Sequence, residues 1–88
     1  MKHFRILVSG RVQGVGFRYH AKQTALKFNI SGYVSNQVDG SVLIEAEGKD
    51  LNIKYFVEWC QKGPDWARVD TTSVSEYPLS NFKGFSIR

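Results

Sequence analysis

The sequence has few of the features that mark exported, disulfide-bonded or membrane proteins. A single cysteine, Cys60, can neither form an internal disulfide nor build a cysteine-based metal cage alone, which excludes disulfide scaffolds and zinc ribbons. The apolar run near the amino terminus is only Ile6, Leu7 and Val8, far shorter than a signal sequence or a membrane span. We therefore expect a reduced, cytoplasmic protein without export or membrane insertion.

Length and composition favour one small folded domain. The 88 residues are 42% hydrophobic and include six Phe, four Tyr and two Trp, enough apolar volume for one core. A chain of this size is well above the roughly 40 residues below which folding needs disulfides or metals. Residues 1–88 are therefore expected to form a single domain, with a monomer as the simplest assumption.

The charge balance is modestly basic. Twelve Lys and Arg residues against eight Asp and Glu give a formal net charge of +4. The lysines are dispersed rather than clustered, which is typical of solvated helix faces and not of a nucleic-acid-binding surface. A small anion such as phosphate or sulfate remains a plausible partner, and nucleic acid is not expected.

The spacing of apolar residues predicts one strand and two helices. Residues 3–9 alternate in polarity like a half-buried strand, whereas from Phe17 apolar residues recur at helical spacing. Asn29 tolerates the left-handed conformation that often ends a helix. A second helical pattern places Cys60 on an apolar face and ends near Lys62, because Gly63 and Pro64 stop it.

The remaining segments are predicted to form strands. Residues 33–38 and 41–47 flank Asp39-Gly40, a dipeptide that favours a two-residue type I′ turn, so they are expected to form a β-hairpin. Residues 68–77 are rich in Val and Thr and end before Pro78, and residues 82–88 form a short last strand. The order β-α-β-β-α-β plus a C-terminal strand predicts an α+β ferredoxin-like sandwich, an antiparallel sheet with two helices on one face.

The segment Gly10 to Arg18 carries the clearest chemical signal. Its glycines allow successive backbone N–H groups to converge on one point, and the following helix start adds unpaired donors and partial positive charge, which suits a phosphate. The spacing matches neither a Walker loop nor the Rossmann fingerprint, since Tyr19 stands where the third glycine would be. Arg18 lies in the first turn of the helix, where a cation is disfavoured unless an anion lies beside it. An exposed arginine lying over the sheet is the alternative explanation.

Several stretches together resemble the acylphosphatase family. Val12-Gln13-Gly14-Val15-Gly16-Phe17-Arg18 is similar to the phosphate-cradle signature of that family. The stretch from Gly32 to Asn36, followed by Asp39-Gly40, resembles its second motif, and 58–60, 63–64 and 67–69 resemble later segments. The resemblance spans nearly the whole chain. The sequence departs from the family pattern at Ser35, Asn29, Tyr33 and Thr72, of which only Ser35 could alter the charge at the mouth of the site.

The resemblance implies a function and roles for individual residues. Arg18 corresponds to the phosphate-binding catalytic arginine and Asn36 to the asparagine that orients water. The implied enzyme is a hydrolase that cleaves the carboxyl–phosphate bond of small acyl phosphates by in-line attack of water, with no metal, no other cofactor and no covalent intermediate. The groups expected to hold the phosphoryl oxygens are the backbone N–H groups of Gln13, Gly14, Val15, Gly16, Phe17 and Arg18, joined by the Arg18 guanidinium.

Three alternatives remain open at the level of sequence. His20 could act as a general base, although residues two apart on a helix point to different faces. An RNA-recognition module shares the β-α-β-β-α-β order, but residues 41–47 contain no aromatic residue, and Glu45 and Glu47 would repel a phosphate backbone. A regulatory domain could keep the anion cradle without turnover.

Overall fold

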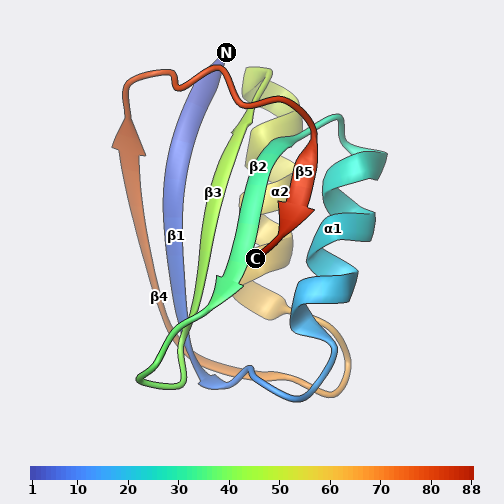
Figure 1. Cartoon of the computed structure of the whole chain (residues 1–88), viewed down its shortest axis with the longest axis vertical. Coiled ribbons are helices and arrows are strands. Elements are labelled where there is room, and N and C mark those ends of the chain that lie inside the picture. The colour runs from blue at the N-terminus through green and yellow to red at the C-terminus, as the bar shows by residue number, and fades with distance from the viewer.

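Two helices cover one face of a five-stranded sheet in the computed structural model, which describes residues 1–88 (Figure 1). The order across the sheet is β4-β1-β3-β2-β5. Neither helix is long and apolar enough to cross a membrane. This architecture confirms the ferredoxin-like α+β sandwich. Along the chain the elements are β1 (Lys2–Arg11), α1 (Phe17–Lys27), β2 (Ser31–Asn36), β3 (Val42–Gly48), α2 (Asp50–Lys62), β4 (Arg68–Tyr77) and β5 (Phe85–Ile87).

Both helix ends follow the local signals in the sequence. After α1, Asn29 adopts a left-handed conformation with φ of 56°, and the Ile30 N–H donates back to the Ala25 carbonyl at 2.8 Å. After α2, Gly63 has φ of 74° and its N–H donates to the Trp59 carbonyl at 2.7 Å. The predicted ends at Asn29 and Gly63 are therefore confirmed.

The last strand makes the sheet mixed, not wholly antiparallel as predicted. The chain after β4 passes over one end of the sheet, so that β5 descends beside β2 in the same direction (Figure 1). Two backbone hydrogen bonds flank the pairing, from the Gly32 N–H to Gly84 O at 2.9 Å and from the Arg88 N–H to Val34 O at 2.8 Å. Only residues 85–87 of the predicted strand 82–88 are regular.

The hairpin between β2 and β3 forms, but its turn differs from the predicted type I′ turn. The Gln37 N–H donates to Ser41 O at 2.8 Å and the Gly40 N–H donates to Gln37 O at 3.1 Å, which leaves residues 38–40 as a three-residue loop. Asp39 does not adopt the positive φ that a type I′ turn requires, and only Gly40, with φ of 95°, does.

Strand register explains why the shorter turn is excluded. Val34 lies opposite Ile44, and both side chains are fully buried on the helix-covered face. A two-residue turn at Asp39-Gly40 would slip the register by one and set Val34 opposite Glu45, whose side chain lies on the other face. The Asp39 carboxylate instead accepts hydrogen bonds from the Ser41 N–H and hydroxyl, which lower the Asp39 pKa and fix the longer loop.

Two buried acidic residues form hydrogen bonds on the sheet face that the helices do not cover. The Glu45 carboxylate contacts Arg5 and lies 2.6 Å from His3 Nε2, while His3 Nδ1 lies 2.8 Å from the Pro78 carbonyl. Glu47 accepts the N–H groups of Ser80 and Phe82. Both glutamates are only 2% exposed. The two glutamates are thus bonded within the protein and covered by residues 78–82, so they do not present free carboxylates on the sheet surface.

The core lies between the sheet and the helices. Alternate residues of the strands meet the buried faces of α1 and α2, and Phe56 packs edge-on against Phe85 at 5.8 Å. Cys60 is fully buried in this core, as its place on the apolar face of α2 predicted. Burial raises the pKa of the Cys60 thiol far above its ordinary value.

Cys60 should be unreactive while the protein is folded. The thiolate is the nucleophile, and burial both disfavours that form and blocks access. An aromatic disulfide reagent should label Cys60 slowly in native buffer and rapidly in concentrated urea. Native labelling as fast as that of a free small-molecule thiol would contradict the burial.

Candidate functional site

The loop between β1 and α1 depends on two left-handed glycines. Gly14 has φ of 74° and Gly16 has φ of 79°. A Cβ atom at Gly14 would meet nothing within 4 Å, so it is the backbone angle and not space that requires glycine there. These two residues turn the chain sharply from the end of β1 into the first turn of α1.

The loop and helix start present an unbroken run of free backbone donors. The seven N–H groups from Gln13 to Tyr19 donate to no acceptor within the protein, and the first helical bond runs from the His20 N–H to Gly16 O at 3.0 Å. Gly16 provides no side-chain cap, and the first turn of α1 contains no acidic residue. Such donors, at the positive end of a helix dipole, form an environment that an anion satisfies.

Arg18 and Asn36 meet at one cavity beside this loop, with a volume of about 250 Å³. Arg18 comes from the first turn of α1. Asn36 is the last residue of β2, opposite the buried Val42, and therefore lies on the helix-covered face of the sheet. The other residues lining the cavity are Val12, Gly14, Gly16, Phe17, Tyr19 and Ile87.

Most of the site residues predicted from sequence meet at this cavity, but two do not line it. The Val15 side chain packs against the hydrophobic core. The Gln13 side chain points to the hairpin, where its Nε2 lies 2.7 Å from Gln37 O and 2.9 Å from Ser41 O. Their backbone N–H groups still belong to the run of free donors.

The charge of Arg18 has no Asp or Glu partner. Its Nη1 lies 3.5 Å from the main-chain oxygen of Arg88, and no Asp or Glu side chain lies within ion-pair distance. By contrast, hydrogen bonds and charge from Glu45 raise the pKa of Arg5, and Asp70 does the same for Arg68. Arg18 therefore adds a positive charge, paired with no Asp or Glu, where the helix dipole is already positive.

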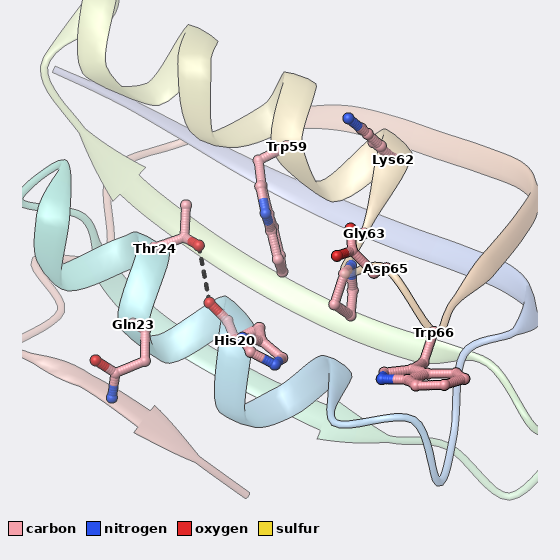
Figure 2. A pocket seen from close by; sticks show the side chains of 9 residues that line it. His20, Gln23, Thr24, Trp59, Lys62, Gly63, Asp65 and Trp66 are labelled. Atoms are coloured by element: carbon pink, nitrogen blue, oxygen red, sulfur yellow. Dashed lines mark hydrogen bonds between the residues drawn. The ribbon is translucent and has the colours of Figure 1, made fainter.

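A larger groove, of about 490 Å³, lies on the other side of α1 (Figure 2). It separates α1 from the end of α2, and His20 faces into it together with Trp59 and Trp66. On the α1 side of the groove, the Thr24 hydroxyl donates to the His20 carbonyl at 2.8 Å. His20 thus lines a different cavity from Arg18, as their spacing of two residues along a helix predicts.

No side chain at the Arg18 cavity is an obvious acid or base. Its lining contains one arginine, one asparagine and one tyrosine as polar side chains. Nowhere in the chain do three or more His, Cys, Asp or Glu side chains gather so that they could hold a metal ion. The chemistry available at this cavity is therefore the binding of an anion and the orientation of a neutral molecule such as water.

Comparison with known proteins identifies the family. The acylphosphatase family model matches residues 4–87. This chain belongs to the acylphosphatase family. An acylphosphatase of Oceanobacillus iheyensis is 49% identical over 77 residues, which cover 86% of this chain and 85% of that protein. As a family member the chain is a hydrolase with acylphosphatase activity.

Solved acylphosphatase structures agree with the fold. The crystal structure of acylphosphatase from Bacillus subtilis is 43% identical, with a TM-score of 0.96 over 100% of this chain and 99% of that one. A full-length HypF, solved in a phosphate- and nucleotide-bound form, is 32% identical with a TM-score of 0.91, covering 99% of this chain and 12% of its own. The acylphosphatase fold thus also occurs as a small part of a much larger protein.

The site residues predicted from sequence did not include Val12, Tyr19 and Ile87, which line the cavity, and did not foresee the side-chain contacts of Gln13. Ile87 reaches the cavity only because β5 joins the sheet beside β2, which no local pattern reveals. Tyr19 follows the motif directly, so its place in the first turn of α1 was the available signal.

Replacing Gly14 with alanine should weaken anion binding without unfolding the protein. The left-handed conformation costs an alanine about 1–2 kcal/mol, and relief of that strain would move the neighbouring N–H groups. Gly84→Ala is the matched control, since Gly84 has φ of 69°, equally open surroundings and no part in the loop. Both variants should lose similar stability in urea melts, but only Gly14→Ala should lose affinity for inorganic phosphate by calorimetry. Equal phosphate affinity in the two variants would contradict a role for this loop.

Proposed function

We propose that the cavity at Arg18 and Asn36 hydrolyses acyl phosphates by direct attack of water on phosphorus. The observation that carries this proposal is a run of seven free backbone donors, five of whose residues line a single small cavity together with the Arg18 and Asn36 side chains. Such a set binds a phosphoryl group and orients a water molecule, and neither Arg18 nor Asn36 is a nucleophile that would form a covalent intermediate.

The loop and Arg18 bind the phosphoryl group. The N–H groups from Gln13 to Arg18 donate to its oxygens, and the planar guanidinium of Arg18 donates to two of them at once. Donors fixed before the substrate arrives need no reorganisation during reaction, so they stabilise the charge spread over the oxygens in the transition state. The lack of an Asp or Glu partner leaves Arg18 free for this contact.

Asn36 positions the attacking water. Its side-chain amide oxygen accepts a hydrogen bond from the water and directs a lone pair of the water oxygen at phosphorus. The new phosphorus–oxygen bond forms as the bond to the carboxylate oxygen breaks, and the electron pair of that bond leaves with the carboxylate. The water loses its proton to solvent or to a phosphoryl oxygen, and the products are a carboxylate and inorganic phosphate.

The leaving group explains why so few side chains suffice. A carboxylate is stable without protonation, so the reaction needs no general acid to assist departure. Positioning and charge stabilisation then supply most of the rate enhancement. The mechanism requires neither a metal ion nor a covalent intermediate.

Turnover of a simple aryl acyl phosphate in the presence of a chelator tests the proposal. Arg18→Ala and Asn36→Ala should each lower kcat/KM by roughly 10²- to 10³-fold, the loss typical of removing one group that stabilises a transition state. Arg11→Ala, which removes a nearby exposed arginine outside the cavity, is the control and should retain the parent rate. A parent protein that binds phosphate but shows no turnover would leave an anion-binding domain.

The pH dependence of the rate should be nearly flat around neutral pH, apart from ionisation of the substrate. Asparagine does not titrate, and an arginine stays charged throughout this range. His20→Gln should leave the profile unchanged, because His20 faces the groove between the helices. A bell centred near the ordinary histidine pKa of about 6.5, abolished in that variant, would assign the chemistry to His20 instead.

A further inference from the structure

We infer that the Gln13 side chain is a positioning residue that sets the distance between the phosphate-binding loop and Asn36. The inference rests on the proposed function, since it concerns how the two halves of that site are held together. The Gln13 side chain acts through the hairpin backbone, whereas only its backbone N–H belongs to the phosphate-binding loop. Its side chain does not line the cavity at Arg18 and Asn36.

The contacts of Gln13 use both of its amide hydrogens. Nε2 donates to Gln37 O at 2.7 Å and to Ser41 O at 2.9 Å. Ser41 O also accepts the Gln37 N–H, which closes the last pair of the hairpin. With both hydrogens engaged by backbone carbonyls, the amide nitrogen has no donor left for a phosphoryl oxygen.

The Gln13 contact joins two parts of the site that are carried by strands that are not neighbours in the sheet. The loop leaves the end of β1, whereas Asn36 ends β2, and β3 lies between those two strands. The loop and the hairpin lie at the same end of the sheet (Figure 1). The two hydrogen bonds of Gln13 are the only ones that join residues 12–16 to residues 36–42.

The residue held by Gln13 directly follows Asn36. The Gln37 N–H, which belongs to the peptide bond with Asn36, donates to Ser41 O, while Gln13 contacts both Ser41 O and the Gln37 carbonyl. These contacts hold Gln37 on both sides and thereby fix the backbone from which the Asn36 side chain extends. The loop whose N–H groups and Arg18 hold the phosphoryl group, by contrast, is also anchored by Val12, Val15 and Phe17, which pack in or against the core. Loss of the Gln13 hydrogen bonds should thus displace the water relative to phosphorus while phosphate binding persists.

Replacement of Gln13 by methionine, which keeps the length but removes both donors, tests the inference. A displacement of about 1 Å at a reacting centre lowers rates by as much as roughly 100-fold, so kcat should fall between roughly tenfold and 100-fold. Inhibition by inorganic phosphate should change less than about threefold, because each 1.4 kcal/mol of binding energy is tenfold in affinity and none is removed from the cradle. Gln61→Met, an exposed glutamine on α2, is the matched control and should behave as the parent.

A double-mutant cycle with Asn36→Ala separates positioning from a general structural effect. If Gln13 acts through Asn36, then adding Gln13→Met to Asn36→Ala should change kcat less than about threefold. A fall in kcat by the same factor in both backgrounds, or a phosphate affinity that falls in step with kcat, would overturn the inference. Parent turnover with an unaffected Gln13→Met variant would also overturn it while leaving the proposed function intact.

If the residual kcat of Asn36→Ala is too low for the double-mutant cycle, an NMR measurement tests the same role of Gln13. In phosphate-saturated protein, Gln13→Met should shift or broaden the Asn36 side-chain amide signals, while the amides of residues 14–18 still respond to phosphate. If the Gln13→Met variant fails to fold, Gln13→Asn replaces it. Asparagine keeps the amide donors but is shorter by one methylene, so they should not reach the hairpin carbonyls. Unchanged Asn36 signals in a folded variant would refute the role of Gln13.

Discussion

Seven consecutive backbone N–H groups without internal partners are the constraint on which this small structure depends. A segment whose N–H groups make no hydrogen bonds within the protein must be held in place largely by side-chain contacts. Phe17, at the junction of loop and helix, is buried and packs against Trp59 at 5.4 Å. A side chain at Gly63 would approach the Phe17 ring within 2.8 Å, so the glycine that ends α2 also makes room for the anchor of the loop.

The second support comes from the face of the sheet that the helices leave open. Glu45 and Glu47 hold residues 78–82 against β1 and β3 through His3 and two backbone N–H groups. That segment leads directly into β5, which brings Ile87 to the cavity and the main-chain oxygen of Arg88 near Arg18. Buried charge on one face of the sheet thereby shapes a wall of the site on the other face. Removal of one partner would leave an unpaired buried charge, which is why such networks tolerate little change.

The features that the sequence predicted correctly are set by local signals, whereas those it did not predict are set by packing between distant segments. The helix ends at Asn29 and Gly63 follow from backbone conformations that few other residues adopt, and the core faces follow from periodicity. The hairpin turn was mispredicted because the register of Val34 against Ile44 outweighs the preference of Asp39-Gly40 for a two-residue turn. The direction of β5, the burial of Glu45 and the contacts of Gln13 depend on segments 24 or more residues apart, so no window of sequence contains them.

A site built largely from backbone donors depends on side-chain identity at few positions. Substitution cannot remove an N–H group from the loop, except by proline, and can only misplace it. The requirement at Gly14 and Gly16 is therefore conformational, whereas in the proposed mechanism only Arg18 and Asn36 contribute side-chain chemistry. A reaction whose leaving group needs no proton is suited to so sparse a site, because rigid placement replaces acid–base groups. Placement in turn comes from the packing of Phe17 and the contacts that fix β2 and β5, so the proposed site needs no more scaffold than these 88 residues supply.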